Sequence, residues 1–111
     1  MDCKYADKAL LFKALSDPTR LMIIDMLSFG ELCACVILAQ FQITQPTLSY
    51  HMKALCDSGL VNGRKQGKWM YYSLNSDVFD DIRDFLDNIT TSNISVVCSE
   101  SSCEVVCKQL Q

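Results

Sequence analysis

A mainly α-helical domain with one small β-hairpin is the fold class that the sequence predicts, and three observations predict it. One helix is expected between Thr44, a residue type favoured at the N-cap, and Gly59, with Pro46 tolerated in its first turn. Another helical stretch comes before it, and a short turn joins the two. Residues 60–74 then combine strand-favouring aromatic residues with Gly-containing turns. A helix-turn-helix followed by such a hairpin is a winged helix-turn-helix.

The helix after Thr44 has one apolar and one polar face. Leu48, Met52 and Leu55 recur at helical spacing, so their face should be buried. The opposite face carries short hydrogen-bonding groups and a cation, namely Gln45, Thr47, Ser49, Tyr50, His51 and Lys53. A helix in the DNA major groove presents such groups, and a solvated amphipathic helix has the same pattern. We treat this segment as a candidate recognition helix.

Three helical stretches are expected before the recognition helix. Residues 5–15 lack Gly and Pro, and their apolar side chains lie nearly all round the helix, which favours cover by a partner subunit. Asp17 and Pro18 begin a second helix whose buried face runs over residues 21–27. Residues 31–41 form the third, which is the first helix of the helix-turn-helix.

The hairpin over residues 60–74 is expected to be basic at its tip. Asn62-Gly63 and Gln66-Gly67 supply turn chemistry. Its cations are Arg64, Lys65 and Lys68. Cations on a wing suit phosphate or minor-groove contacts, and the alternative is a solvated loop.

A last helix over residues 76–89, with Ser76 as its cap, carries a wide apolar stripe. The stripe consists of Val78, Phe79, Ile82, Phe85, Leu86 and Ile89. Burial of this stripe against its copy and the first helix predicts a homodimer, whose two recognition helices would match a palindromic operator. We place the DNA-binding and dimerisation domain at residues 1–91 and a Cys-containing C-terminal tail at residues 92–111.

Charge is unevenly distributed along the 111 residues. The net charge is −3, yet residues 44–74 hold four cations against Asp57 alone and carry +3. Positive charge therefore lies beside the recognition helix, as DNA binding requires. No apolar run is long enough for a membrane span and no signal core is found, so we expect a cytoplasmic protein.

The seven cysteines are expected to serve metal or redox chemistry, because an odd number without an export signal argues against a disulfide scaffold. Cys56 is expected to pack as a small hydrophobe. His51 is the only histidine and has no orienting partner in the sequence pattern, so we do not expect an enzyme.

From about residue 15 to residue 74 the chain resembles the ArsR/SmtB winged-helix repressors. The matching segments are ALSDPTRL, ELCAC, TQPTLSYHMKAL, SGLV and RKQGKWMYYSL. The resemblance implies a homodimer that binds double-stranded operator DNA and releases it when a metal or metalloid binds. It also places the polar residues between Gln45 and His51 on the DNA-facing helix and residues 64–68 on the wing. Tyr50 stands where many relatives carry Arg.

The segment ELCAC is similar to the ELCVCDLC of arsenic-responsive members, whose three thiolates bind trivalent arsenic or antimony. Cys33 and Cys35 match the first two thiolates, but the third falls at Leu38, and Val36 replaces an Asp. Thiolates are soft ligands that select such thiophilic ions. Zinc sensing through the last helix is known in this family and needs both Asp and His ligands there. The last helix of this chain has no histidine, so we do not expect that zinc site.

Several sources of a third ligand remain open. They are Cys103 or Cys107 of the tail, Cys3 as in the cadmium- and lead-sensing branch, and a small exogenous thiol. Two thiolates suffice if the inducer is a methylated trivalent arsenical. Cys98, Cys103 and Cys107 are alternatively a site of their own, or incidental surface cysteines.

Spacing also predicts how a ligand would act. Side chains two apart on a regular helix point about 200° from each other, so Cys33 and Cys35 could not meet on one ion without unwinding the third helix.

The main hypothesis is a repressor derepressed by As(III) or Sb(III). A redox-sensing or cadmium/lead-sensing repressor of the same fold is the alternative, and a thiol-rich metal carrier without DNA function is a third.

Overall fold

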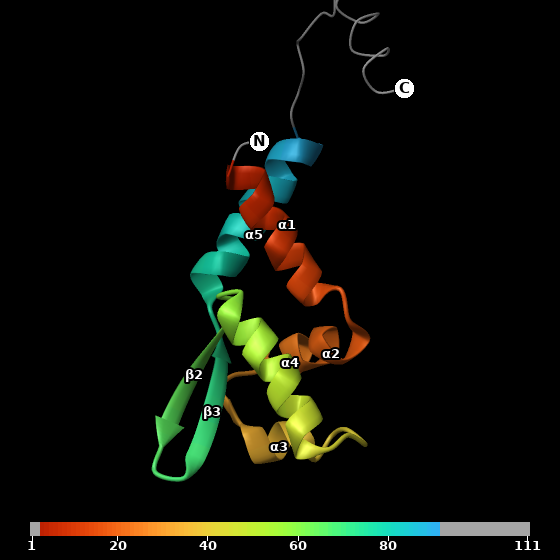
Figure 1. Ribbon diagram of the computed structural model, residues 1–111. Helices are drawn as coiled ribbons and strands as arrows, with labels where there is room; N and C mark the ends of the chain where they lie inside the picture. Colours follow the sequence, from red (N-terminus) through yellow and green to blue (C-terminus); the bar gives the residue numbers. More distant parts are fainter. Residues whose placement is uncertain (1–2, 92–111) are drawn as a thin grey trace, which may run out of the picture.

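The computed structural model describes residues 3–91, which form a mainly helical domain with a small antiparallel sheet (Figure 1). In chain order the elements are α1 (Cys3–Leu15), α2 (Pro18–Leu27), β1 (Leu32–Cys33), α3 (Ala34–Leu38), α4 (Gln45–Asp57), β2 (Val61–Gln66), β3 (Trp69–Leu74) and α5 (Ser76–Thr90). The three strands lie in the order β1-β3-β2. The predicted winged helix-turn-helix is confirmed, with α3 and α4 as the helix pair and β2 and β3 as the wing.

Side-chain caps begin the two helices whose starts the sequence specified. The Asp17 carboxylate accepts hydrogen bonds from the backbone N–H groups of Thr19 at 2.8 Å and Arg20 at 3.2 Å. Thr44 Oγ1 accepts one from the Thr47 N–H at 3.3 Å. Each capping side chain accepts hydrogen bonds from backbone N–H groups that have no partner within the helix. Compared with Ala at the same position, such a cap stabilises the helix by about 1 kcal/mol.

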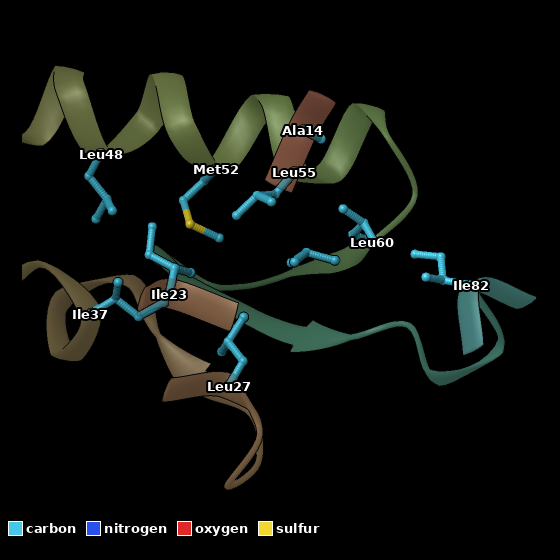
Figure 2. Close-up of a cluster of buried hydrophobic side chains, with 10 residues drawn as sticks. Ala14, Ile23, Leu27, Ile37, Leu48, Met52, Leu55, Leu60 and Ile82 are labelled. Atoms are coloured by element: carbon cyan, nitrogen blue, oxygen red, sulfur yellow. The ribbon is translucent and has the colours of Figure 1, made fainter. Parts of the chain in front are cut away.

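The apolar face of α4 forms one side of the core (Figure 2). Leu48, Met52 and Leu55 are between 0% and 3% exposed, and they point toward Ile23 of α2 and Ile37 of α3. Full burial of each such side chain stabilises the fold by about 1.5–3 kcal/mol. This packing fixes the rotation of α4 about its axis, so its opposite face is turned to solvent.

The third helix is shorter than the sequence predicted. A helix over residues 31–41 was expected, but helical structure covers only α3, because Leu32 and Cys33 form β1 and pair with Tyr72 and Tyr71 of β3. The edge of β3 offers these residues a ladder of hydrogen bonds in place of helical ones. Cys33 is therefore extended, with φ −71° and ψ 146°, and stands at the N-cap of α3.

The wing is a hairpin closed by two residues, Gly67 and Lys68. Gly67 has φ +61° and no non-Gly residue of the described chain has positive φ, so the loop fits a type II′ turn with Gly at its first position. The expectation that Asn62-Gly63 also forms a turn is wrong, since both residues lie within β2 and pair with β3.

Helices α1 and α5 lie side by side at one end of the molecule (Figure 1). The Phe85 ring lies 6.4 Å from that of Tyr5 and 6.3 Å from that of Phe12. Both helices still expose apolar side chains, among them Leu10 at 62% and Ile89 at 58%. Asn75, rather than the predicted Ser76, occupies the N-cap of α5, and it makes no side-chain capping bond.

Within residues 3–91, no helix combines the length and the apolar character needed to cross a bilayer.

Truncation of the α4 core should destabilise the protein strongly. We expect Leu55→Ala to lower the free energy of unfolding by about 2–5 kcal/mol, because Leu55 is fully buried and its loss leaves a cavity. Leu21→Ala is the matched control, since Leu21 is 52% exposed on α2 and should cost well under half as much. Urea unfolding at one fixed protein concentration measures both, and equal losses would contradict the placement of α4.

Candidate nucleic-acid interface and thiol site

The solvent face of α4 presents most of the side chains that the sequence assigned to it. Gln45, Thr47, Ser49 and Lys53 are exposed, and Tyr50 is 66% exposed. Thr44 and Thr47 share a hydrogen bond of 3.0 Å, and Lys53 forms an exposed ion pair with Asp57 at 3.1 Å. The first turns of α4 therefore expose hydroxyl, amide and phenol groups. These groups can form hydrogen bonds with base edges and can donate hydrogen bonds to phosphates.

His51 lies inside, and the expectation that it belongs to the outward face is wrong. It is only 9% exposed, and its Nδ1 accepts a hydrogen bond from Arg20 Nε at 3.1 Å. The Arg20 guanidinium also lies 5.5 Å from the centre of the Tyr50 ring. Arg20 thus links α2 to α4 by two contacts, a hydrogen bond to His51 and a cation–π contact with Tyr50.

The three wing cations have different surroundings. Arg64 makes a two-pronged ion pair with Glu31, with Nη2–Oε1 at 2.6 Å and Nε–Oε2 at 3.2 Å, and lies 4.8 Å from the Tyr71 ring centre. The hydrogen bond raises the pKa of Arg64 and lowers that of Glu31. Lys65 and Lys68 are exposed, and Lys68 lies 5.3 Å from the centre of the Trp69 ring. The two lysines are the wing cations that remain available for phosphate contacts.

Glu31 is a residue that sequence reasoning did not single out. It stands 33 positions before Arg64, and it immediately precedes β1, which carries Cys33. Its ion pair therefore joins the wing to the thiol-bearing segment. Because no periodicity links two such distant positions, the sequence pattern held no signal for the pair.

Cys33 and Cys35 bring their sulfurs together without any change in the helix. Their Sγ atoms are 3.0 Å apart, with the Cys35 thiol donating to Cys33. The prediction that the two side chains point away from each other is wrong, because Cys33 is extended in β1 while Cys35 lies in the first turn of α3. Capture of one thiophilic atom by both sulfurs therefore needs no unwinding.

The hydrogen bond between the two sulfurs makes them chemically unequal. It lowers the pKa of Cys33, whose thiolate accepts the bond, and raises the pKa of Cys35, which must keep its proton to donate. Cys33 is thus the stronger nucleophile of the pair at neutral pH. The pKa of Cys56 is raised for another reason: mainly by burial, and to a smaller extent by the negative charge of Asp57. Its partial burial agrees with the predicted role as a packed residue.

The thiol pair lines a cavity of about 340 Å³ between α3, α4 and the wing. Its apolar walls come from Leu38, Leu48, Met52, Trp69, Met70 and Tyr72. Gln45, Ser49 and Lys68, three of the predicted DNA-facing residues, also line it. Sequence reasoning assigned Trp69 and Met70 only to a strand, because their approach to the thiols depends on the pairing of β1 with β3.

A third ligand does not accompany the pair in the described part of the chain. Among residues 3–91, no group of three or more His, Cys, Asp or Glu side chains is arranged to hold a metal ion. Leu38 occupies a half-buried position on the cavity wall. Cys98, Cys103 and Cys107 lie outside the described residues, and Cys3 is described only as the first residue of α1.

Comparison with known proteins gives consistent matches. Residues 17–63 match the family described as "Bacterial regulatory protein, arsR family". An arsenical resistance operon repressor of Staphylococcus aureus is 51% identical over 85% of this chain and 90% of its own length. The crystal structure of an ArsR family transcriptional regulator superposes with a TM-score of 0.74 at 26% identity, covering 81% of this chain and 93% of that one. HlyU from Vibrio cholerae does so with 0.67 at 30% identity, over 80% and 97%.

The unequal thiols predict an order of alkylation. With substoichiometric iodoacetamide near pH 7, we expect Cys33 to react before Cys35 and Cys56, because its pKa is lowered and theirs are raised, and thiolate fraction follows the pKa. Cys35→Ala removes the donor and should slow the reaction of Cys33. Peptide mass spectrometry resolves the three sites, and faster labelling of Cys35 than of Cys33 would contradict the hydrogen-bond direction.

Proposed function

The chain belongs to the arsR family of bacterial regulatory proteins, and on that premise we propose that it is a repressor released from operator DNA by trivalent arsenic or antimony bound to Cys33 and Cys35. The observation that carries the proposal is the 3.0 Å separation of the two sulfurs beside the recognition helix α4. Two soft thiolates so close together favour a thiophilic ion over harder cations. The name of the Staphylococcus aureus relative supports the same inducer class.

The DNA-binding surface that we propose consists of the outward side chains of α4 and the wing lysines. Gln45, Thr47, Ser49 and Tyr50 would meet base edges or phosphates in the major groove, while Lys65 and Lys68 would neutralise phosphates beside it. His51 is left out of this surface because it is buried. Arg64 stays a candidate phosphate contact, and a phosphate would have to compete with its exposed ion pair to Glu31.

Two connections join the thiol pair to this surface. The cavity that Cys33 and Cys35 line is also lined by Gln45 and Ser49 of α4. In addition, Cys33 pairs with Tyr71 of the wing. A ligand on the sulfurs therefore changes the packing where helix and wing meet. It weakens DNA binding only if it binds the DNA-free conformation more tightly, and a typical coupling of about 1–3 kcal/mol would lower operator affinity about 5–150-fold.

We propose that the repressor is a homodimer formed through α1 and α5. These neighbouring helices expose Tyr5, Leu10, Leu86 and Ile89, which are each 44–62% exposed in the single chain. Burial of these side chains against a second copy would remove apolar surface from water. A twofold axis there would present two recognition helices to a palindromic site.

Oxidation is a second candidate trigger, and the same short sulfur separation favours it. A disulfide needs sulfurs about 2.0 Å apart, so only a small approach from 3.0 Å is required. The two triggers differ in the mass of the DNA-free protein. Arsenic raises the mass as it replaces the thiol protons, whereas a disulfide lowers it by two hydrogen atoms, which leave as two protons and two electrons taken up by an oxidant.

The wing lysines should set the salt dependence of DNA binding. We expect Lys65→Ala and Lys68→Ala each to reduce the slope of log K against log salt by about 1.8 for the dimer, because each would remove one phosphate contact per protomer. The probe is a duplex that the wild-type protein selects from a random pool, and fluorescence anisotropy gives K. Arg83→Ala on α5 removes the same charge away from the wing and should leave the slope unchanged. The proposed surface fails if all three variants behave alike.

The thiol pair should control release. Arsenite is expected to dissociate the same duplex from wild type and from Cys56→Ser, but not from Cys33→Ser or Cys35→Ser, which should still bind DNA. Intact-mass spectrometry of the released protein then separates metalloid from disulfide. Normal release from both single variants would remove these cysteines from the mechanism.

A further inference from the structure

Arg20 of α2 is held by groups from both α1 and α4. Its backbone N–H donates to the Asp17 cap, which fixes the residue in the first turn of α2. The guanidinium donates from Nε to His51 Nδ1 at 3.1 Å and from Nη1 to the Ala14 carbonyl at 3.4 Å. Its central carbon lies 5.5 Å from the centre of the Tyr50 ring. Arg20 therefore has a defined position between a buried histidine and an exposed tyrosine.

Tyr50 is the bulkiest of the outward side chains of α4, and it is 66% exposed. Its ring meets Arg20 and the edge of the His51 ring, whose centre is 5.4 Å away. A cavity of about 370 Å³ lies beside it between α1 and α4, with Leu10 and Ala54 on its wall. A phenol ring that nothing holds could turn into this cavity and away from a DNA groove, because burial of its carbon surface there is favourable.

We propose that Arg20 is a positioning residue for DNA recognition, which holds the Tyr50 ring where its hydroxyl reads one base pair. Arg20 thereby determines specificity through the tyrosine rather than by its own contact with a base. This inference rests on the proposed function, since it requires α4 to lie in the major groove. A side chain that is ordered only on binding weakens binding roughly two- to ten-fold, and a ring that can shift also adapts to a wrong base. Both effects reduce the affinity ratio between the preferred and a mismatched site.

A direct phosphate contact is the alternative role for Arg20. The residue is half-buried, and Nε and Nη1 already donate to protein groups, so among the described residues only Nη2 is left without a hydrogen bond. A phosphate contact predicts an equal loss of affinity on every duplex and rescue by lysine, which keeps the charge. Positioning predicts a loss at one base pair and no rescue, because a single ammonium nitrogen cannot hold the three partners of a planar guanidinium.

The experiment measures base-pair discrimination. In the duplex that the wild-type protein selects from a random pool, each base pair is replaced singly, and fluorescence anisotropy gives the affinity ratio for each position. Tyr50→Ala identifies the position that Tyr50 reads, where the ratio should fall at least about five-fold. Arg20→Lys should lower the ratio at that position roughly two- to ten-fold and leave the other positions unchanged. Lys13→Ala, which removes a cation from the wall of the same cavity, should leave every ratio unchanged.

Two further comparisons separate positioning from a merely structural role. In Tyr50→Ala protein, Arg20→Lys should cause no additional change in any ratio, because the ring through which it acts is gone. His51→Leu removes the acceptor of Arg20 Nε and should lower the same ratio as Arg20→Lys does. His51→Asn keeps an acceptor oxygen near the position of Nδ1 and should retain the ratio. The two histidine variants leave Arg20 in place, so the test does not depend on the stability of one variant.

Several results would overturn the inference. They are an equal loss at every position in Arg20→Lys, wild-type ratios in Arg20→Lys or in Tyr50→Ala, an additional loss from Arg20→Lys when Tyr50 is absent, and identical ratios in His51→Leu and His51→Asn. In each case the wild-type protein still selects a duplex, so the proposed function stands. Selection of no duplex by the wild-type protein contradicts the proposed function itself.

Discussion

Burial of one face of α4 is the constraint on which both the candidate interface and the thiol site depend. Leu48, Met52 and Leu55 are held against Ile23 and Ile37, so the helix cannot rotate without exposing its core residues. The same packing turns the polar face outward and makes Leu48 and Met52 the inner wall of the thiol cavity. The candidate DNA-binding face and the thiol cavity therefore share one helix, and a change in packing at the cavity would act on the helix that carries the candidate face.

Sequence reasoning recovered the features that local chemistry determines. The caps at Asp17 and Thr44 and the apolar spacing of α4 depend on neighbours within a turn or two, so the helix starts and the winged architecture were predictable. What failed depends on distant partners. Because Cys33 pairs with Tyr71, α3 is shorter than predicted and the two thiols point toward each other rather than apart. His51 is buried, with a hydrogen bond from Arg20 of α2.

The wing cations also have partners that lie far away in the sequence. Counting cations on the wing gave three candidates for phosphate contact, but the count does not say which of them a carboxylate already holds. Arg64 is held by Glu31 and stacked on Tyr71, so its charge serves to orient the wing against the segment that carries the thiols. An exposed ion pair adds little to stability. The two parallel hydrogen bonds of this pair and the neighbouring Tyr71 ring nevertheless fix the orientation of the Arg64 guanidinium.

The two-residue closure of the wing has a mechanical consequence. A turn of Gly67 and Lys68 joins β2 directly to β3, so the hairpin has no longer loop at its tip that could bend separately from the strands. Cys33 pairs with Tyr71, which lies only three residues from Lys68 along the chain. A rotation of β3 at that pairing would therefore reach the lysine through a short, regular stretch of strand with no loop to absorb it.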